Sequence, residues 1–106
     1  MAFRPPTNSL GKATLSNGQE MLIDEIVAEQ ASALGHQGRK VEKLLAALRA
    51  AEEAGDAEAC ADLTRRAARE VWAFFVQREM CGMRNHKSVI KEMQIPRAVL
   101  LRLGVF

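Results

Sequence analysis

Apolar residues recur along most of the chain at the three- and four-residue spacing of an α-helix. Val41, Leu44, Leu45 and Leu48 occupy positions i, i+3, i+4 and i+7, which places them on one face of a helix. Two further segments carry similar stripes, first Leu22, Ile26, Val27 and Leu34, and then Leu63, Ala67, Val71 and Phe74. The pattern therefore predicts amphipathic helices, each with one buried face.

Glycine and proline separate these periodic segments and predict where the helices end. Gly35 and Gly38 bracket one expected turn, Gly55 marks a second, Gly82 a third, and Pro96 opens the last helix. The expected helices span residues 19–34, 39–54, 57–81, 86–94 and 96–103. Residues 1–18, with two prolines and two glycines, are expected to form an irregular N-terminal arm, and residues 19–106 a single helical domain.

The expected helix lengths predict an arrangement. Helices joined by short turns run antiparallel, and the segment 57–81 would extend roughly 13 Å beyond its neighbour at 1.5 Å per residue. The fold class is therefore all-α: a three-helix up-down-up bundle with a long third helix plus a C-terminal short helix pair. The extending part contains the stretch 71–76, which is apolar all round and is expected to be buried on every side. Trp72, Phe74 and Phe75 are the expected anchors of the core or of a dimer, because a second subunit would help to cover them.

Composition agrees with a helical fold and says little about function. Strong helix formers (Ala, Leu, Met, Glu, Gln, Lys, Arg) number 63, whereas Val, Ile and Thr number 14. The net charge of +2 does not by itself indicate nucleic-acid binding. The charge is uneven, because residues 84–106 sum to +4 while four carboxylates and no cation lie between Lys12 and Arg39. These acidic and basic ends are expected to attract each other, within one chain or across a homodimer.

The chain carries no signal for a membrane, an oxidising compartment or a cofactor. Its longest apolar run is six residues, and its start resembles no secretory signal. Cys60 and Cys81 would lie about 30 Å apart on one helix, too far for a disulfide. We therefore expect a cytoplasmic protein with reduced thiols.

One end of the predicted bundle is a candidate polar pocket for an anion. If the 35–38 turn lies beside the end of the 57–81 helix, several polar side chains gather there, namely His36, Arg78, Glu79, Arg84, Asn85 and His86. The structural interpretation is favoured over the pocket: Arg78 and Glu79 form caps and ion pairs that join the fourth helix to the third.

An enzyme is not expected. Cys81 and His86 could be a nucleophile and its base, but no residue is identifiable that would orient the histidine. The chain has no metal-binding motif, so no metal is expected, and no glycine-rich phosphate loop, so no cofactor is expected.

Residues 86–103 offer a second kind of function. Two short helices joined near Pro96 have the outline of a helix-turn-helix, with Lys87, Lys91, Arg97 and Arg102 as candidate nucleic-acid contacts. Against this, Gln94 stands where such a turn commonly has glycine, and Ile90 is bulky where the first helix commonly has a small residue. Nucleic-acid binding is therefore the alternative rather than the main prediction.

Residues 71–104 also carry a resemblance. The stretch 72–79 (WAFFVQRE), with Cys81-Gly82, Arg84-Asn85-His86, Val89-Ile90 and Ile95-Pro96, resembles a family of small alphaproteobacterial proteins classed as a domain of unknown function. The opening Phe3-Arg4-Pro5-Pro6 is similar too. The resemblance implies a compact helical protein and supplies no activity. The sequence as a whole favours a non-enzymatic interaction module that forms a homodimer.

Overall fold

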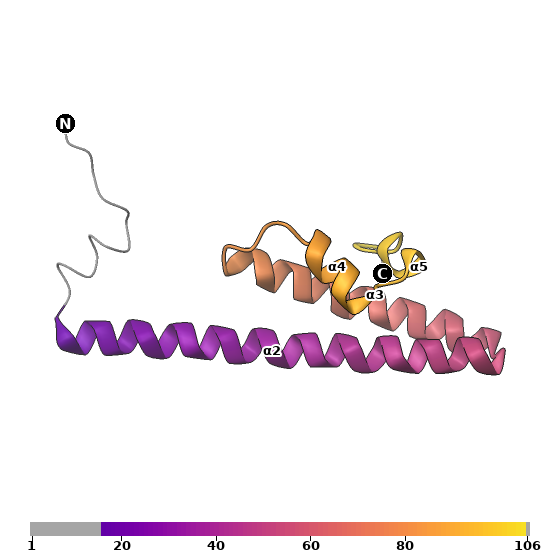
Figure 1. Ribbon diagram of the computed structural model, residues 1–106, viewed down its shortest axis with the longest axis horizontal. Coiled ribbons are helices and arrows are strands. Elements are labelled where there is room, and N and C mark those ends of the chain that lie inside the picture. Colours follow the sequence, from indigo (N-terminus) through magenta and orange to yellow (C-terminus); the bar gives the residue numbers. More distant parts are fainter. Residues whose placement is uncertain (1–15, 106) are drawn as a thin grey trace, which may run out of the picture. The chain divides into compact units, whose positions relative to one another are not determined.

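The computed structural model describes residues 16–105, and every regular element in that range is a helix (Figure 1). The elements are α2 (Asn17–Ala54), α3 (Ala57–Met80), α4 (Lys87–Met93) and α5 (Arg97–Leu100). The all-α class is thus confirmed. Most of the predicted N-terminal arm, residues 1–15, lies outside the described residues.

The chain divides into two compact units, Met1–Ser32 and Ala33–Phe106. The described part of the first unit is the beginning of α2. In the second unit, the remainder of α2 and the whole of α3 form a helical hairpin, and α4 and α5 fold back beside α3 (Figure 1).

The first turn of α2 is fixed by a capping box. The Ser16 hydroxyl accepts a hydrogen bond from the Gln19 backbone N–H at 3.2 Å, and the Gln19 side chain accepts one from the Ser16 N–H at 2.9 Å. This reciprocal pair satisfies two backbone donors that a helix start leaves open. The helix therefore begins at Asn17, two residues earlier than predicted, and Gly18 lies inside it.

The predicted turn at residues 35–38 is wrong, because α2 continues through it without a break. Neither Gly35 nor Gly38 has a positive φ. A new helix after Gly38 would need an N-cap such as Ser, Thr, Asp or Asn, and residues 35–40 contain none. Instead, Gly38 lets the Phe74 ring come close: a Cβ at position 38 would lie 3.4 Å from its Cε1.

The predicted three-helix up-down-up layout is replaced for the same reason. The expected first and second helices are one helix of 38 residues, and α3, with 24 residues, is the shorter of the two long helices. The expectation that the third helix extends beyond its neighbour depended on the predicted turn at residues 35–38. Because α2 has no turn there, that expectation is also wrong.

The break between α2 and α3 is where glycine and a cap occur together. Gly55 has φ +69°, and the Asp56 N–H reaches back to the Ala51 carbonyl at 3.1 Å. Asp56 then caps α3, since its Oδ1 accepts from the Ala59 N–H at 3.1 Å. The second predicted boundary is thus confirmed.

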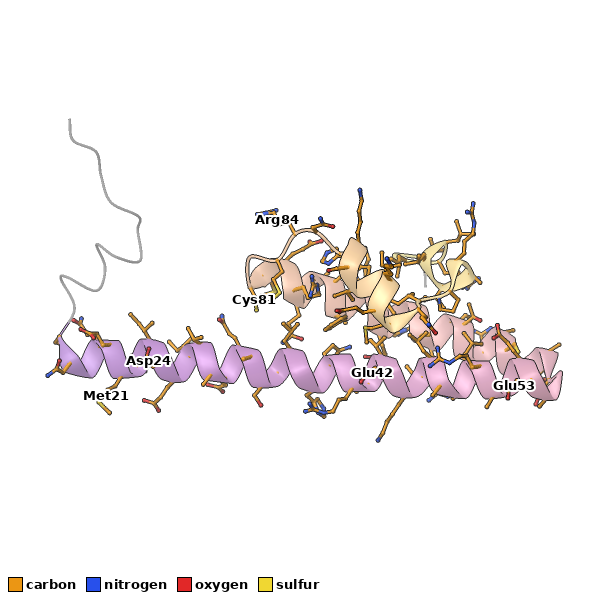
Figure 2. The ribbon with its side chains drawn as sticks, in the orientation of Figure 1. Met21, Asp24, Glu42, Glu53, Cys81 and Arg84 are labelled. Carbon is orange, nitrogen blue, oxygen red and sulfur yellow. The ribbon has the colours of Figure 1, made fainter. Side chains whose placement is uncertain are left out.

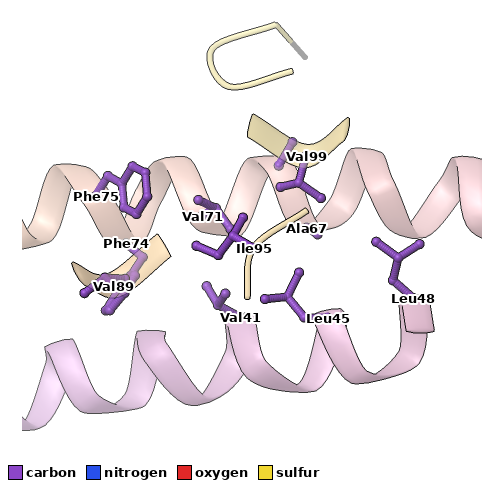
Figure 3. Packing of buried hydrophobic residues seen from close by; sticks show 11 residues of the cluster. Val41, Leu45, Leu48, Ala67, Val71, Phe74, Phe75, Val89, Ile95 and Val99 are labelled. Atoms are coloured by element: carbon purple, nitrogen blue, oxygen red, sulfur yellow. The ribbon is translucent and has the colours of Figure 1, made fainter. Parts of the chain in front are cut away.

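The hydrophobic core lies between α3, the second part of α2 and the C-terminal segments (Figure 3). From α2 it takes Val41, Leu45 and Leu48, which are 0–2% exposed. The other buried members are Ala67, Ala68, Val71, Phe74, Phe75, Val89, Ile95 and Val99. Contributions from α4, α5 and the linker between them explain why these short elements are held in place.

The stretch 71–76 is buried on one side and not, as predicted, on every side. Val71, Phe74 and Phe75 belong to the core, following the i, i+3, i+4 pattern. Trp72 and Val76 are 45% and 38% exposed. The covering segments α4 and α5 contribute Val89 and Val99 to the same core as the first three residues.

The C-terminal helix pair is present but shorter than predicted. α4 ends at Met93 and is capped by Gln94, which has a left-handed conformation (φ 53°, ψ 50°). The Ile95 N–H bonds to the Ile90 carbonyl at 3.1 Å. This is the Schellman arrangement, with glutamine at the position that glycine favours. Pro96 precedes α5, which has only four residues before the chain continues in turns.

Candidate functional site

The C-terminal end of α3 reverses the chain and brings residues 85 and 86 back against it. Gly82 has φ +90°, and the Met83 N–H donates to the Arg78 carbonyl at 2.9 Å. The Gly82 N–H bonds to the Glu79 carbonyl at 3.0 Å, completing a second Schellman closure. Glycine is required here because an L side chain disfavours such a positive φ.

His86 is the centre of the polar cluster that results. The Arg78 Nε–H donates to His86 Nδ1 at 3.1 Å, and His86 Nε2 lies 2.9 Å from Glu79 Oε2. Since an arginine nitrogen can only donate, Nδ1 is the acceptor and Nε2 carries the proton that the carboxylate accepts. The imidazole also stacks on Phe75, with ring centroids 4.2 Å apart and planes 2° from parallel.

Arg78 and Asn85 extend this cluster through the backbone. The second guanidinium contact of Arg78 goes to the Asn85 carbonyl at 3.1 Å. The Asn85 Oδ1 accepts from the Lys87 N–H at 3.0 Å, which supports the first turn of α4. Arg78 also lies 6.0 Å from the centre of the Phe74 ring. These contacts tie the loop and α4 to the end of α3.

The structure thus brings together four of the six pocket candidates: Arg78, Glu79, Asn85 and His86. It does not bring His36 or Arg84 to them. His36 is exposed on α2, and none of the described hydrogen bonds or ion pairs involves it. Arg84 is exposed and points away from the helices of its unit (Figure 2). The polar atoms of the cluster bond to one another, an arrangement suited to holding a loop in place.

A second polar surface, which the sequence analysis missed, lies between α2 and α3. A groove of about 440 Å³ is lined by four cations, one carboxylate and one leucine, namely Lys40, Lys43, Arg66, Arg69, Glu70 and Leu44. We call this the basic groove. Each pair of cations is three residues apart on its helix, so each pair lies on one helix face. The three-residue spacing of each pair is visible in the sequence. The predicted turn at residues 35–38 implied a different pairing of helices, so the sequence analysis did not place the two pairs on opposite sides of one groove.

The single carboxylate of the basic groove already has partners within the chain. Glu70 Oε1 accepts a hydrogen bond from Gln37 Nε2 at 2.7 Å and lies 3.4 Å from the Lys40 ammonium. The Gln37 amide also donates to the Glu70 backbone carbonyl at 3.1 Å. Arg66 pairs with another carboxylate, that of Asp62, at 3.6 Å. With four cations against these two carboxylates, the groove keeps an excess of positive charge.

The apolar side chains of residues 17–32 are exposed. Met21, Leu22, Ile23, Ile26 and Val27 are 43–66% exposed, a large apolar surface for a stretch of 16 residues. Figure 2 shows the side chains of this segment, with Met21 and Asp24 labelled. We call this stretch the acidic segment, because it also carries Glu20, Asp24, Glu25 and Glu29.

The candidate nucleic-acid residues do not gather on one surface element. Lys87 and Lys91 are exposed on α4, and Arg97 is exposed at the start of α5. Arg102 is partly buried, with its Nε buried and without a hydrogen-bond partner, and it lines a different cavity beside Cys60. With four residues, α5 is about one turn long, which leaves little helix to enter a groove of DNA.

Three further observations concern sites of other kinds. Cys60 and Cys81 are free thiols, both partly buried. Among residues 16–105, no cluster of three or more His, Cys, Asp or Glu side chains is placed to hold a metal ion. In the same range, no helix combines the length and apolarity needed to span a bilayer.

Comparison with known proteins places the chain in a family. The model of a family of unknown function, DUF6665, matches residues 1–106. The chain belongs to that family. The resemblance noted from residues 71–104 is thereby confirmed, while the alphaproteobacterial origin that it implied stays a prediction. No curated protein and no solved structure matched the chain.

Proposed function

We propose that this protein is a non-enzymatic interaction module that acts as a homodimer. The observation that carries the proposal is the exposed apolar side of the acidic segment. Four large apolar side chains there, Leu22, Ile23, Ile26 and Val27, are 43–57% exposed. Burying a side chain such as Ile or Leu stabilises an association by roughly 1.5–3 kcal/mol, so an amphipathic helix of this kind gains most by packing against another surface.

The polar cluster supports the non-enzymatic part of the proposal. Both ring nitrogens of His86 are engaged by Arg78 and Glu79, which leaves no position on the ring for a substrate proton. A cytoplasmic location is part of the same proposal, because Cys60 and Cys81 are free thiols.

Sedimentation velocity from 1 to 100 µM tests the homodimer. We expect a dimer at tens of micromolar and a shift toward monomer on dilution. A charged residue in the apolar stripe, Ile26→Asp, should raise the dimer Kd at least ~10-fold. Ser32→Asp adds the same charge outside the stripe and serves as the control. A wild-type chain that is monomeric at 100 µM would refute the proposal.

Nucleic-acid binding through residues 86–103 stands second. The local excess of cations favours it, whereas the single turn of α5 and the partly buried Arg102 weigh against it. A salt titration with duplex DNA separates the two functions, because binding by phosphate contacts weakens steeply as salt rises. No binding at low salt would remove this alternative.

A further inference from the structure

The acidic segment has the geometry of an interface helix. At about 100° per residue, its apolar stripe covers an arc of roughly 140°, formed by Leu22, Ile23, Ile26 and Val27. Carboxylates line both edges of the stripe: Glu20 and Asp24 follow one edge, and Glu25 and Glu29 follow the other. A surface that receives this helix should therefore combine apolar area with cations.

The outward face of α3, together with the basic groove, has that combination. Toward the N-terminal half of α3 the exposed side chains include three cations, Arg65, Arg66 and Arg69, and two acids, Glu58 and Asp62. Asp62 pairs with Arg65 at 3.0 Å and with Arg66 at 3.6 Å. Toward the C-terminal half they are apolar, with Trp72, Val76 and Met80 spaced i, i+4 and i+8 and 45%, 38% and 79% exposed. Lys40 and Lys43 add positive charge from α2 across the groove.

The charges and the lengths of the two surfaces match. The acidic segment carries four carboxylates and no cation. The lining of the basic groove has four cations and one carboxylate, Glu70, which is held by Gln37 and Lys40. A second carboxylate, Asp62, pairs with Arg66 at 3.6 Å, and the cations still outnumber these two acids. Residues 17–32 and residues 65–80 are both about 24 Å long as helices.

We infer that the acidic segment of one copy docks on the outward face of α3 and the basic groove of a second copy. This inference rests on the proposed homodimer and names its two surfaces. A two-fold axis repeats the contact, so each copy provides one acidic segment and receives one. Apolar burial against Trp72, Val76 and Met80 supplies affinity, and the flanking charges fix the orientation and speed the encounter.

The basic groove fits this role better than the basic C-terminal end. Its cations face one another from two helices and line one cavity. The C-terminal cations are spread over a loop, α4, α5 and a turn, and Arg102 is partly buried. A helix laid on the C-terminal end would therefore meet fewer cations within the reach of its carboxylates.

Charge reversal on each surface tests the inference. One variant reverses the segment (Glu25→Lys with Glu29→Lys), and the other reverses the groove (Lys43→Glu with Arg66→Glu). Each should raise the dimer Kd at least ~30-fold in low salt, because like charges then face each other. The controls carry the same charge changes elsewhere, at exposed positions: Glu52→Lys with Glu53→Lys, and Lys91→Glu with Arg97→Glu. Far-UV circular dichroism checks that every variant keeps its helical content.

Mixing the two reversed variants gives the decisive result. Alone, the segment-reversed chain has a segment of zero net charge whose 25/29 edge is positive and faces a basic groove. Alone, the groove-reversed chain has a groove of net charge −1 facing an acidic segment. In an equimolar mixture, the positive 25/29 edge meets the acidic groove, and the acidic segment meets the basic groove. Native mass spectrometry should then show a heterodimer with a Kd within ~3-fold of the wild-type value.

The possible failures are distinguishable. A monomeric wild type at 100 µM refutes the homodimer and this docking mode together. A dimer that survives both reversals keeps the homodimer and refutes the docking mode. Loss of the dimer with Lys91→Glu and Arg97→Glu alone assigns the acidic segment to the C-terminal end and refutes the groove. The docking mode is also refuted if each reversed variant has a weaker dimer and the mixture does not recover the wild-type Kd.

Discussion

Alanine in place of Gly35 and Gly38 tests whether α2 is continuous. Both glycines lie within α2, and neither has a positive φ. A turn at this place would need the conformational freedom of glycine, whereas a continuous helix is weakened by it. The double substitution should therefore stabilise the protein.

The expected gain follows from the environment of each glycine. Alanine is favoured over glycine inside a helix by about 0.8–1.0 kcal/mol per position. A Cβ at position 38 would lie 3.4 and 3.5 Å from Cε1 and Cζ of Phe74, at the close end of van der Waals contact and without overlap. At position 35 its nearest neighbour is the flexible guanidinium of Arg39, at 3.4 Å. The two changes together should add about 2 kcal/mol, or about 8–16 °C in Tm for a domain of this size.

Thermal and urea unfolding followed by circular dichroism at 222 nm measure this gain. Gly55→Ala is the matched control, since Gly55 has φ +69° and ends α2, so alanine there should cost roughly 1 kcal/mol or more. If alanine at positions 35 and 38 lowers stability as alanine at position 55 does, the chain turns at residues 35–38 and the continuous helix is refuted.

Three further substitutions probe the core, a cap and the polar cluster. Leu45→Ala removes a side chain that is 1% exposed, and it should cost about 2–5 kcal/mol in urea unfolding; a smaller loss would mean that this part of the core is loosely packed. Gln94→Gly should stabilise by about 0.5–1 kcal/mol in the same assay, because Gln94 has φ 53° and is exposed; no gain would contradict the left-handed conformation. His86→Ala should cost roughly 1–3 kcal/mol through its lost bonds and its lost stack on Phe75, whereas the exposed His36→Ala should change stability by less than about 0.5 kcal/mol.

The comparison of two glycine positions shows what the sequence could and could not predict about the fold. Gly55 is followed at once by Asp56, a helix cap, and there the predicted break is real. Gly38 is followed by Arg39 and Lys40, neither of which caps a helix, and it lies under the Phe74 ring. Glycine alone therefore did not distinguish a turn from a close contact between helices. The absence of a cap was in the sequence, but the Phe74 contact depends on the tertiary structure.

The candidate polar cluster shows the same difference between contacts that are local in the sequence and contacts that depend on the tertiary structure. Arg78, Glu79, Asn85 and His86 are within eight residues of one another, and a glycine turn is enough to bring them together. His36 was added to them only through the predicted turn, and it lies elsewhere on α2. The basic groove joins residues about 26 positions apart in the sequence. It forms only because α2 and α3 pair in a particular way, and the sequence pattern alone did not predict that pairing.

The position of Trp72 has a spectroscopic consequence. The chain has one tryptophan and no tyrosine, so all indole emission comes from this single site. The residue is 45% exposed, and its ring lies beside the turn at Gly104, where a Cβ would be 3.7 Å from the ring. Because indole emission moves to shorter wavelength as the ring leaves water, the unlabelled protein reports by its own fluorescence when that patch of α3 becomes covered.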